Sequence, residues 1–125
     1  MKQGKSTIQS LPVWQEAHTF TLNIYALTSR FPKEEMRGLT TQMRRAAVSL
    51  SAHIAESYSR SSKRDKTLFL DIAQGSLAEQ RYYLQLALDL DYGDTTALEA
   101  QLDIVSELLD SQFRALQSVP QSKAA

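Results

Sequence analysis

The sequence lacks cysteine entirely, and it contains only 4 glycines and 3 prolines, the residues that most often interrupt helices. The absence of cysteine excludes disulfide bonds, thiolate metal sites and a cysteine nucleophile. It also suits a reducing compartment, so we predict a cytoplasmic protein. No segment approaches the roughly 20 apolar residues of a membrane-spanning helix, so we expect no membrane contact.

A chain of 125 residues forms about one ordinary domain with its own hydrophobic core. Helical patterning begins near residue 11, ends near residue 118 and is divided by three short breaks, with no long linker or internal repeat. We therefore predict a flexible N-terminal segment over 1–10, one helical domain over 11–118 and a disordered tail over 119–125.

The formal net charge is zero, but the two parts of the chain have opposite charge. Residues 1–70 carry eleven basic and five acidic side chains, a net charge of +6. Residues 71–125 carry three basic and nine acidic side chains, a net charge of −6. We therefore expect an electrically polar molecule.

The first predicted helix runs from Pro12 to about Ser29. Pro12 suits the first helical position, and the Phe31-Pro32 step ends the helix because the residue before proline is pushed out of the α region. Apolar residues recur at alternating spacings of four and three, the period of a helix that packs one stripe in a bundle. This predicted stripe consists of Val13, Ala17, Phe20, Ile24, Leu27 and Phe31.

The second predicted helix spans about Leu39 to Tyr58, and a serine-rich stretch at 59–62 ends it. Its small residues should allow a neighbouring helix to approach closely. These small residues are Ala46, Ala47, Ser49, Ser51, Ala52 and Ala55.

The third predicted helix begins at a capping pair, Ser62 with Asp65, and continues to about Leu90. Its apolar side chains cover too much of the helix circumference for one bundle face, so we expect it to have two packing partners. Gly75 lies in its middle, where glycine costs about 1 kcal/mol relative to alanine. We therefore predict a close helix crossing at Gly75.

Thr96 and Glu99 have the spacing of a capping box, and the fourth predicted helix continues from them towards Pro120. Short connections between four long helices favour antiparallel neighbours, so we predict an all-α fold, an up-and-down antiparallel four-helix bundle. The surplus apolar surface indicates self-association. The residues that we predict at the oligomer interface are Trp14, Tyr25, Tyr82, Tyr83 and Leu86.

Three stretches of the chain carry a family resemblance: LPVWQEAHTFTLNIYALTSRFPKEE, RGLTTQMRRAAVSLSAHIAES and FLDIAQGSLAEQRYYLQLALDL. They resemble the four-helix bundle proteins called S23-type 23S ribosomal RNA intervening-sequence proteins. This family includes the accessory variability determinant of diversity-generating retroelements. The resemblance covers about Leu11 to Leu90, and it departs from the family pattern at His53, where asparagine is usual, and at Ser57, where glycine is usual.

The resemblance implies a four-helix bundle that assembles as a ring-like homopentamer without catalytic activity. For the retroelement branch it implies binding to a reverse transcriptase and to RNA or DNA through a basic surface. The neutral net charge favours a general family member over that more basic branch.

Seven basic residues are the candidate nucleic-acid contacts, because arginine and lysine bind phosphates without reading sequence. Adjacent residues point about 100° apart on a helix, so we expect that Arg44 and Arg45 do not serve one surface. The alternative is an ordinary solvated face in which Arg45 pairs with Glu56. The seven candidates are Arg37, Arg44, Arg45, Arg60, Lys63, Arg64 and Lys66.

A nucleophile triad or half of a di-iron site could be proposed from the spacing of Ser49, His53 and Glu56. We reject both interpretations. Neighbours on one helix leave no place for a substrate, and a di-iron bundle needs a Glu-x-x-His motif on each of two helices. We therefore predict structural roles for His53 and His18. Tyr82 with Tyr83 could stack on bases, but packing or subunit contact is the favoured role.

Two functional hypotheses remain open. The first is an oligomeric, non-enzymatic bundle that binds nucleic acid or a nucleic-acid enzyme through its basic side. The alternative is a structural or protein-binding scaffold, with charges that set subunit register and solubility. Neither needs a cofactor, a metal or a small-molecule substrate.

Overall fold

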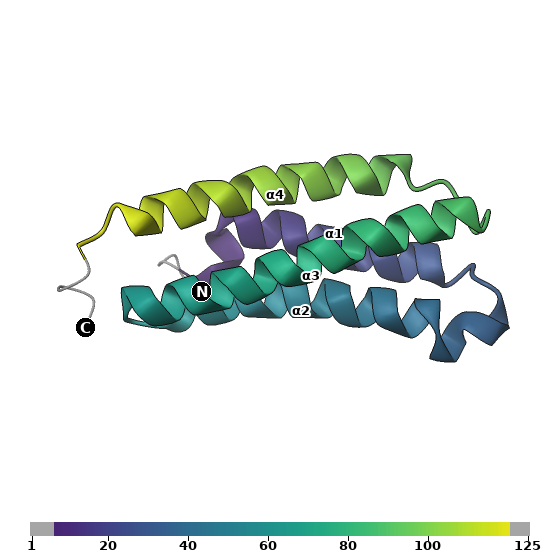
Figure 1. Ribbon diagram of the computed structural model, residues 1–125, viewed down its shortest axis with the longest axis horizontal. Coiled ribbons are helices and arrows are strands. Elements are labelled where there is room, and N and C mark those ends of the chain that lie inside the picture. Colours follow the sequence, from purple (N-terminus) through teal and green to yellow (C-terminus); the bar gives the residue numbers. More distant parts are fainter. Residues whose placement is uncertain (1–6, 121–125) are drawn as a thin grey trace.

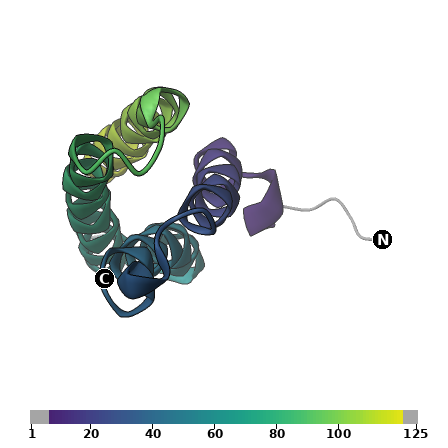
Figure 2. The same cartoon turned by 90° about the vertical axis from the view of Figure 1, so that its right-hand side faces the viewer.

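The computed structural model describes residues 7–120, and every regular element within them is a helix (Figure 1). The long helices are α1 (Pro12–Thr28), α2 (Leu39–Ser59), α3 (Lys63–Asp89) and α4 (Thr96–Gln117), and the short 3₁₀ helices are η1 (Ile8–Ser10) and η2 (Lys33–Arg37). Each long helix packs against its neighbours in the order α1, α2, α3, α4 and back to α1 (Figure 2). The predicted up-and-down antiparallel four-helix bundle is confirmed.

A short turn precedes the first helix of the bundle. Residues 7–10 fall in the segment predicted as flexible, but Ile8–Ser10 forms a 3₁₀ turn that leads into α1. The remainder of that segment, 1–6, and residues 121–125 of the predicted tail lie outside the described residues.

The stripe predicted on α1 forms one wall of the core. Val13, Phe20 and Ile24 are buried, and Pro12 occupies the start of the helix as expected. Thr21 Oγ1 lies 2.9 Å from Ser51 Oγ and donates to the carbonyl of Ala47 at 3.1 Å. This polar contact joins α1 to α2 inside the core, and every buried group in it has a partner.

The largest helix interface of the bundle lies between α2 and α3. Ala46 and Ala47 are buried on α2, and the small side chains let α3 approach closely, as predicted. Gln80 of α3 is fully buried and donates from Nε2 to the Met43 carbonyl of α2 at 2.9 Å. A buried hydrogen bond of this kind fixes the relative position of the two helices along their axes.

The close crossing predicted at Gly75 is wrong. Gly75 is exposed, and a Cβ atom added there would meet nothing within 4 Å among the described residues. The next residue, Ser76, faces α2 instead, with its Oγ 2.8 Å from Ser49 Oγ. The buried stripe of α3 at this point consists of Ala73, Ser76 and Leu77. Gly75 lies on the opposite side of the same helical turn and therefore faces solvent.

The surplus apolar surface of α3 is real, but the single chain covers only part of it. Leu70, Leu77 and Leu84 are buried, whereas Leu68 and Tyr82 are 52% and 62% exposed. The second partner expected for α3 is α4, which also packs against it. Two neighbours on one side still leave an apolar strip facing solvent.

Helix capping was predicted correctly for α3 and one residue out of place for α4. Ser62 Oγ accepts a hydrogen bond from the Asp65 amide at 3.1 Å, as expected. For α4, Thr95 rather than Thr96 precedes the helix, and its hydroxyl donates to Glu99 at 2.7 Å. Asp94, one residue before the cap position, accepts at Oδ1 from the Thr96 amide at 3.0 Å and so satisfies the first backbone amide of α4.

The two connections at one end of the bundle are tied together by Glu35. Its Oε1 accepts from the Leu39 amide at 3.0 Å, and its Oε2 accepts from the Tyr92 hydroxyl at 2.8 Å. These two donors hold the pKa of the Glu35 carboxyl below its usual value, and the same bond raises the pKa of Tyr92. The Tyr92 ring also packs on Phe31 at 5.1 Å between centroids. The α1–α2 connection is thereby fixed to the α3–α4 turn.

Candidate nucleic-acid interface

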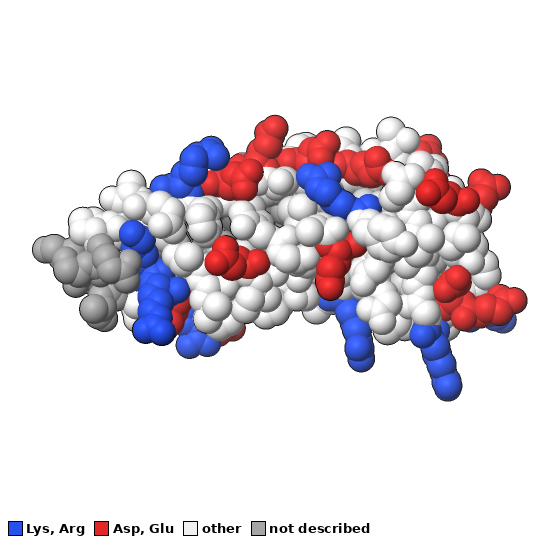
Figure 3. Space-filling model, in the orientation of Figure 1, with Lys and Arg blue, Asp and Glu red and all other residues white. Residues whose placement is uncertain are grey.

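Charge is distributed unevenly over the surface, as the sequence indicated. Figure 3 shows acidic side chains along the edge formed by α4, with few basic ones among them, and basic side chains projecting from the opposite edge. The acidic members of α4 are Glu99, Asp103, Glu107 and Asp110, against the single basic Arg114. The basic edge is therefore the part of the surface that attracts phosphate most strongly.

The seven predicted cations do not form one patch. Arg37, Arg44 and Arg45 lie at or near the start of α2, and the other four lie beyond its end. Arg45 and Arg60 are separated along the chain by about 22 Å, at 1.5 Å per helical residue. The basic edge consists of two groups, one near each end of α2.

The first group borders a shallow hollow of about 540 Å³ on the outer side of α2. Arg44 and Arg45 both line it, together with Tyr25, Val48 and others. The expectation that two adjacent arginines could not serve one surface is wrong, because the hollow is wide enough to reach both helix positions. Cations above an apolar floor can contact phosphate and the face of a base together.

Arg44 is held in place within this hollow. Its Nε donates to Thr28 Oγ1 at 2.9 Å, and its Cζ lies 4.6 Å from the centroid of the Tyr25 ring. The hydroxyl and the cation–π contact orient the guanidinium, and neither partner is an anion that would neutralise its charge. Arg45 is exposed and makes no hydrogen bond or ion pair with any residue in 7–120, so it is available to a ligand.

Arg60, in the second group, already has partners on α2 and α3. It forms an ion pair with Glu56, and its Cζ lies 4.9 Å from the Phe69 ring centroid. The predicted pairing of Arg45 with Glu56 is wrong, because eleven helical residues separate the two by about 16 Å. Glu56 therefore neutralises a member of the second group, not of the first.

Lys63 and Lys66 bind backbone carbonyls at the C-terminal ends of two helices. Lys66 Nζ donates to the Ser57 and Tyr58 carbonyls of α2 at 3.3 and 3.1 Å. Lys63 Nζ donates to the Gln117 and Val119 carbonyls at 3.4 and 2.9 Å, at and just past the end of α4. Terminal carbonyls lack intrahelical partners, and lysines near a C-terminus commonly satisfy them. Both lysines therefore have a structural role, and a phosphate would have to compete with the carbonyls for their N–H donors.

Three of the seven predicted cations remain available: Arg37, Arg45 and Arg64. All three are exposed and make no hydrogen bond or ion pair within the part of the chain that is described. Sequence reasoning left out Arg30 and Lys33, which are exposed on the same connection as Arg37. Arg30 lies seven residues before Arg37 and Lys33 four residues before it, and this spacing is the signal that could have included them.

The residues predicted for the oligomer interface divide into exposed and packed sets. Tyr25 and Tyr82 are 41% and 62% exposed. Trp14, Tyr83 and Leu86 are partly buried and pack against the core of their own chain, with Trp14 also stacked on His18 at 4.8 Å between ring centroids. Of these five side chains, only Tyr82 has more than half of its surface free in the single chain, since Arg44 also lies over the Tyr25 ring.

His53 contacts Ser49, but the contact is not that of a catalytic pair. Its Nδ1 lies 3.0 Å from Ser49 Oγ and 2.8 Å from the Ser49 carbonyl oxygen. The carbonyl can only accept, so this contact is a hydrogen bond in the tautomer with the proton on Nδ1, and in that tautomer Nδ1 takes no proton from the hydroxyl. The residues that the structure describes hold no cluster of three or more histidine, aspartate or glutamate side chains that could bind a metal.

Together, the fold and its surface define a charge-polarised four-helix bundle in which the exposed cations are concentrated on one edge. A family model described as 23S rRNA-intervening sequence protein matches residues 9–111. The chain belongs to this family, which confirms the resemblance drawn from its first three helices.

A solved structure with a similar fold comes from Bacteroides thetaiotaomicron. It is described as a protein of unknown function from the S23 ribosomal protein family, and it superposes with a TM-score of 0.74. The match covers 82% of this chain and 96% of the other at 23% sequence identity, so it supports the fold alone. A search of curated proteins gave no match. Among the described residues, no helix combines the length and apolar character needed to cross a bilayer.

Proposed function

We propose that the protein is a non-catalytic, oligomeric helical bundle that binds nucleic acid, or an enzyme acting on nucleic acid, through its basic edge. The observation that carries the proposal is the concentration of unpaired cations beside α2, opposite the acidic edge of α4. A surface of this kind attracts polyanions by releasing their condensed counterions.

The binding is expected to be independent of sequence. Arg37, Arg45 and Arg64 can each reach phosphate, but the described residues present no helix, hairpin or loop with a row of base-reading side chains. The separation of the two cation groups favours a ligand that extends along α2. We therefore expect RNA and DNA of the same length and strandedness to bind with similar affinity.

Fluorescence anisotropy of a labelled RNA hairpin tests the proposal over a series from about 50 to 200 mM salt. The double variant Arg45→Gln, Arg64→Gln removes one free cation from each group. Each lost phosphate contact should lower the slope of log affinity against log salt by about 0.7 to 0.9.

The matched control is the double variant Arg81→Gln, Arg114→Gln, which removes the same charge from the acidic side. Arg81 pairs with Asp103 at 2.8 Å on the surface, so its loss should affect stability only slightly. Equal losses of RNA affinity in the two doubles, or no affinity in the parent chain at low salt, would refute the proposal.

The alternative function is a protein-binding or purely structural scaffold, and the exposed apolar strip of α3 favours it. Leu68, Ile72 and Tyr82 lie on one face of α3 and are all more than one-third exposed. Such side chains commonly mark subunit contacts. We propose that the strip is used in self-association, with the homopentamer implied by the family as the expected assembly.

Light scattering on the parent chain separates the two functions. The same measurement on Tyr82→Ser tests whether the apolar strip is used in self-association. A multimer that ignores RNA at every salt concentration supports the scaffold. A multimer whose mass rises with RNA at low salt supports the nucleic-acid proposal. A monomer contradicts self-association in both.

A further inference from the structure

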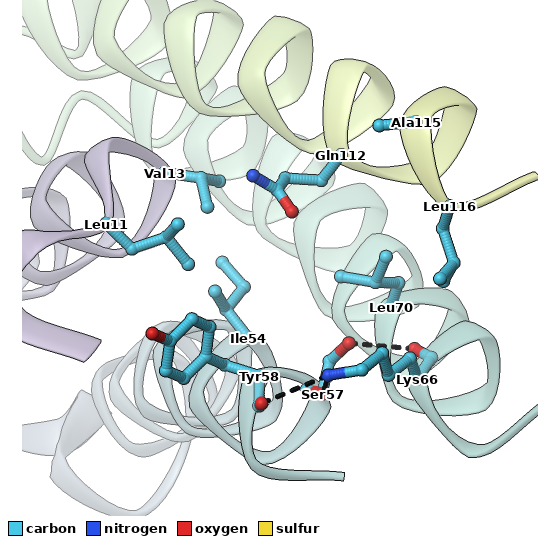
Figure 4. Close-up of a pocket in the computed structure, with 10 residues that line it drawn as sticks. All are labelled: Leu11, Val13, Ile54, Ser57, Tyr58, Lys66, Leu70, Gln112, Ala115 and Leu116. Atoms are coloured by element: carbon cyan, nitrogen blue, oxygen red, sulfur yellow. Dashed lines mark hydrogen bonds between the residues drawn. The ribbon is translucent and has the colours of Figure 1, made fainter. Parts of the chain in front are cut away.

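A cavity of about 280 Å³ lies at the end of the bundle where α2 leads into α3 (Figure 4). All four long helices contribute to its lining. Val13, Ile54 and Leu70 are buried and form apolar walls, and Leu11 and Leu116 are half-buried beside them. At about 30 Å³ per water, the cavity has the volume of roughly nine waters, enough for a ligand with on the order of ten non-hydrogen atoms.

Lys66 is the one charged side chain among the residues that line this cavity. Its ammonium group has three N–H donors, and two of them bond to the Ser57 and Tyr58 carbonyls. One donor is left for a ligand. Gln112 extends from α4 towards Val13 in Figure 4, so an amide also borders the cavity.

The helix ends around the cavity favour a negative charge. The first turns of α1 and α3 lie here, and their backbone amides carry the positive end of each helix dipole. The C-terminal ends of α2 and α4 lie here too, but Lys66 and Lys63 already bind their carbonyls. The carbonyls at the negative helix ends thus have lysine partners. The first turn of α3 is compensated by Ser62 and Asp65, whereas the first turn of α1 has no side-chain cap and no acidic residue.

We propose that this end cavity binds a medium-chain monocarboxylate, with its alkyl chain against Val13, Ile54, Leu70 and Leu116 and its carboxylate at Lys66 Nζ. A single available N–H donor matches a singly charged headgroup better than a phosphate, whose second charge would remain uncompensated. The walls contain aliphatic side chains, so a flexible alkyl chain fits them. The site is independent of the proposed nucleic-acid function, although Lys66 was predicted for that role.

Isothermal titration calorimetry of the full-length protein with octanoate is the first test. Burying each methylene should tighten binding about fourfold, so hexanoate should bind roughly fifteenfold more weakly than octanoate. Octanol keeps the chain without the charge, and octylamine reverses the charge. Both should bind at least about tenfold more weakly than octanoate, which one charge-assisted hydrogen bond is enough to produce.

Two variants locate the site. Lys66→Met removes the ammonium and keeps most of the stem, and it should lower octanoate affinity about tenfold while leaving octanol affinity within about twofold. Lys63→Met is the matched control, because Lys63 lies on the same turn and binds carbonyls but does not line the cavity. It should change neither affinity.

Ala115→Trp is the second variant, and it guards against an effect of Lys66→Met on folding. Ala115 is exposed on the cavity rim, so an indole there can fill the cavity without replacing a core residue. We expect it to abolish octanoate binding while circular dichroism and light-scattering mass stay unchanged. The proposal is overturned by non-saturable octanoate binding, or by octanoate affinity that neither Lys66→Met nor Ala115→Trp reduces.

Discussion

At the end of the bundle that carries the α1–α2 and α3–α4 connections, the Glu35 carboxylate joins the two turns through Leu39 and Tyr92. At the opposite end, Lys63 and Lys66 bond to the carbonyls of helix C-termini. One end is held by an anion and packed aromatic rings, and the other by two lysines, of which Lys66 lines a cavity.

The comparison shows that a charge count does not reveal what a charged residue does. Lys63 and Lys66 contributed to the most basic stretch of the sequence, yet each holds a helix terminus. Arg37 and Arg45 come from less concentrated stretches and have no partner among residues 7–120. Affinity for a polyanion should depend more on such unpaired cations than on local charge density.

The largest expected effect comes from removing the packing at the aromatic end. Phe31 is buried and lies against Tyr92, so Phe31→Ala should lower the free energy of unfolding by about 3 kcal/mol. Leu116→Ala at the opposite end removes a half-buried side chain beside an existing cavity, and it should cost only roughly 1 kcal/mol. Urea denaturation measures both, and equal losses would show that the two ends are equally well packed.

A smaller effect should separate the two lysines. Lys66→Met removes two hydrogen bonds to the last carbonyls of α2, one of them partly buried, and should destabilise the protein by about 1 kcal/mol. Lys63→Met removes exposed bonds and should cost less than about 0.5 kcal/mol. Thermal unfolding at matched protein concentration gives both values. A larger loss for Lys63 would place the more important cap on α4.

The sequence was sufficient for the helices because their signals are local. Pro12, the Phe31-Pro32 step and the Ser62–Asp65 cap fix helix limits within a few neighbouring residues, and the structure has them as predicted. Gly75 and Thr96 were misplaced because one residue of helix rotation, or one residue of cap position, lies below the precision of periodicity. The exact rotation of a helix and the exact residue of its cap are set by packing against the other helices.

The candidate site was less accessible to sequence reasoning because its contacts join distant parts of the chain. Lys63 bonds to carbonyls more than fifty residues away, and Arg44 bonds to Thr28 on another helix. No pattern around these residues marks such partners. The sequence therefore identified the cations that could bind phosphate, but the three-dimensional contacts were needed to show which remain free.

A stabilising change is expected next to the aromatic end. Asp91 follows α3 with a φ of 63°, a left-handed conformation that glycine adopts without strain. Asp91→Gly should raise the free energy of unfolding by about 0.5 kcal/mol, since relief of strain exceeds the added entropy of the unfolded chain. Asp89→Gly, inside the last turn of α3, should instead be destabilising. Urea midpoints of the two variants shifted in the same direction would contradict the argument.

The smallest expected effect is a dependence of stability on pH at the aromatic end. The Leu39 amide and the Tyr92 hydroxyl donate to Glu35 and lower the pKa of its carboxyl from 4.5 in the folded state. The unfolded chain then binds a proton at a higher pH than the folded chain, so the contribution of Glu35 is complete above about pH 4.5 and is lost as the pH falls through the folded pKa.

Glu35→Gln should therefore flatten the decline of melting temperature below pH 4.5. The control is Glu34→Gln, because the neighbouring Glu34 carboxylate makes no hydrogen bond among residues 7–120. This control variant should retain the decline. The Tyr92 pKa is raised above 10.0 by the same bond, so its contribution is complete below about pH 10 and is lost as the pH rises through the folded pKa. Tyr92→Phe should remove the alkaline limb but flatten the acid limb only in part, because the Leu39 amide, the larger cause of the lowered Glu35 pKa, still donates to the carboxylate. A variant that changes only the alkaline limb would show that the Leu39 amide alone sets the acid response of Glu35.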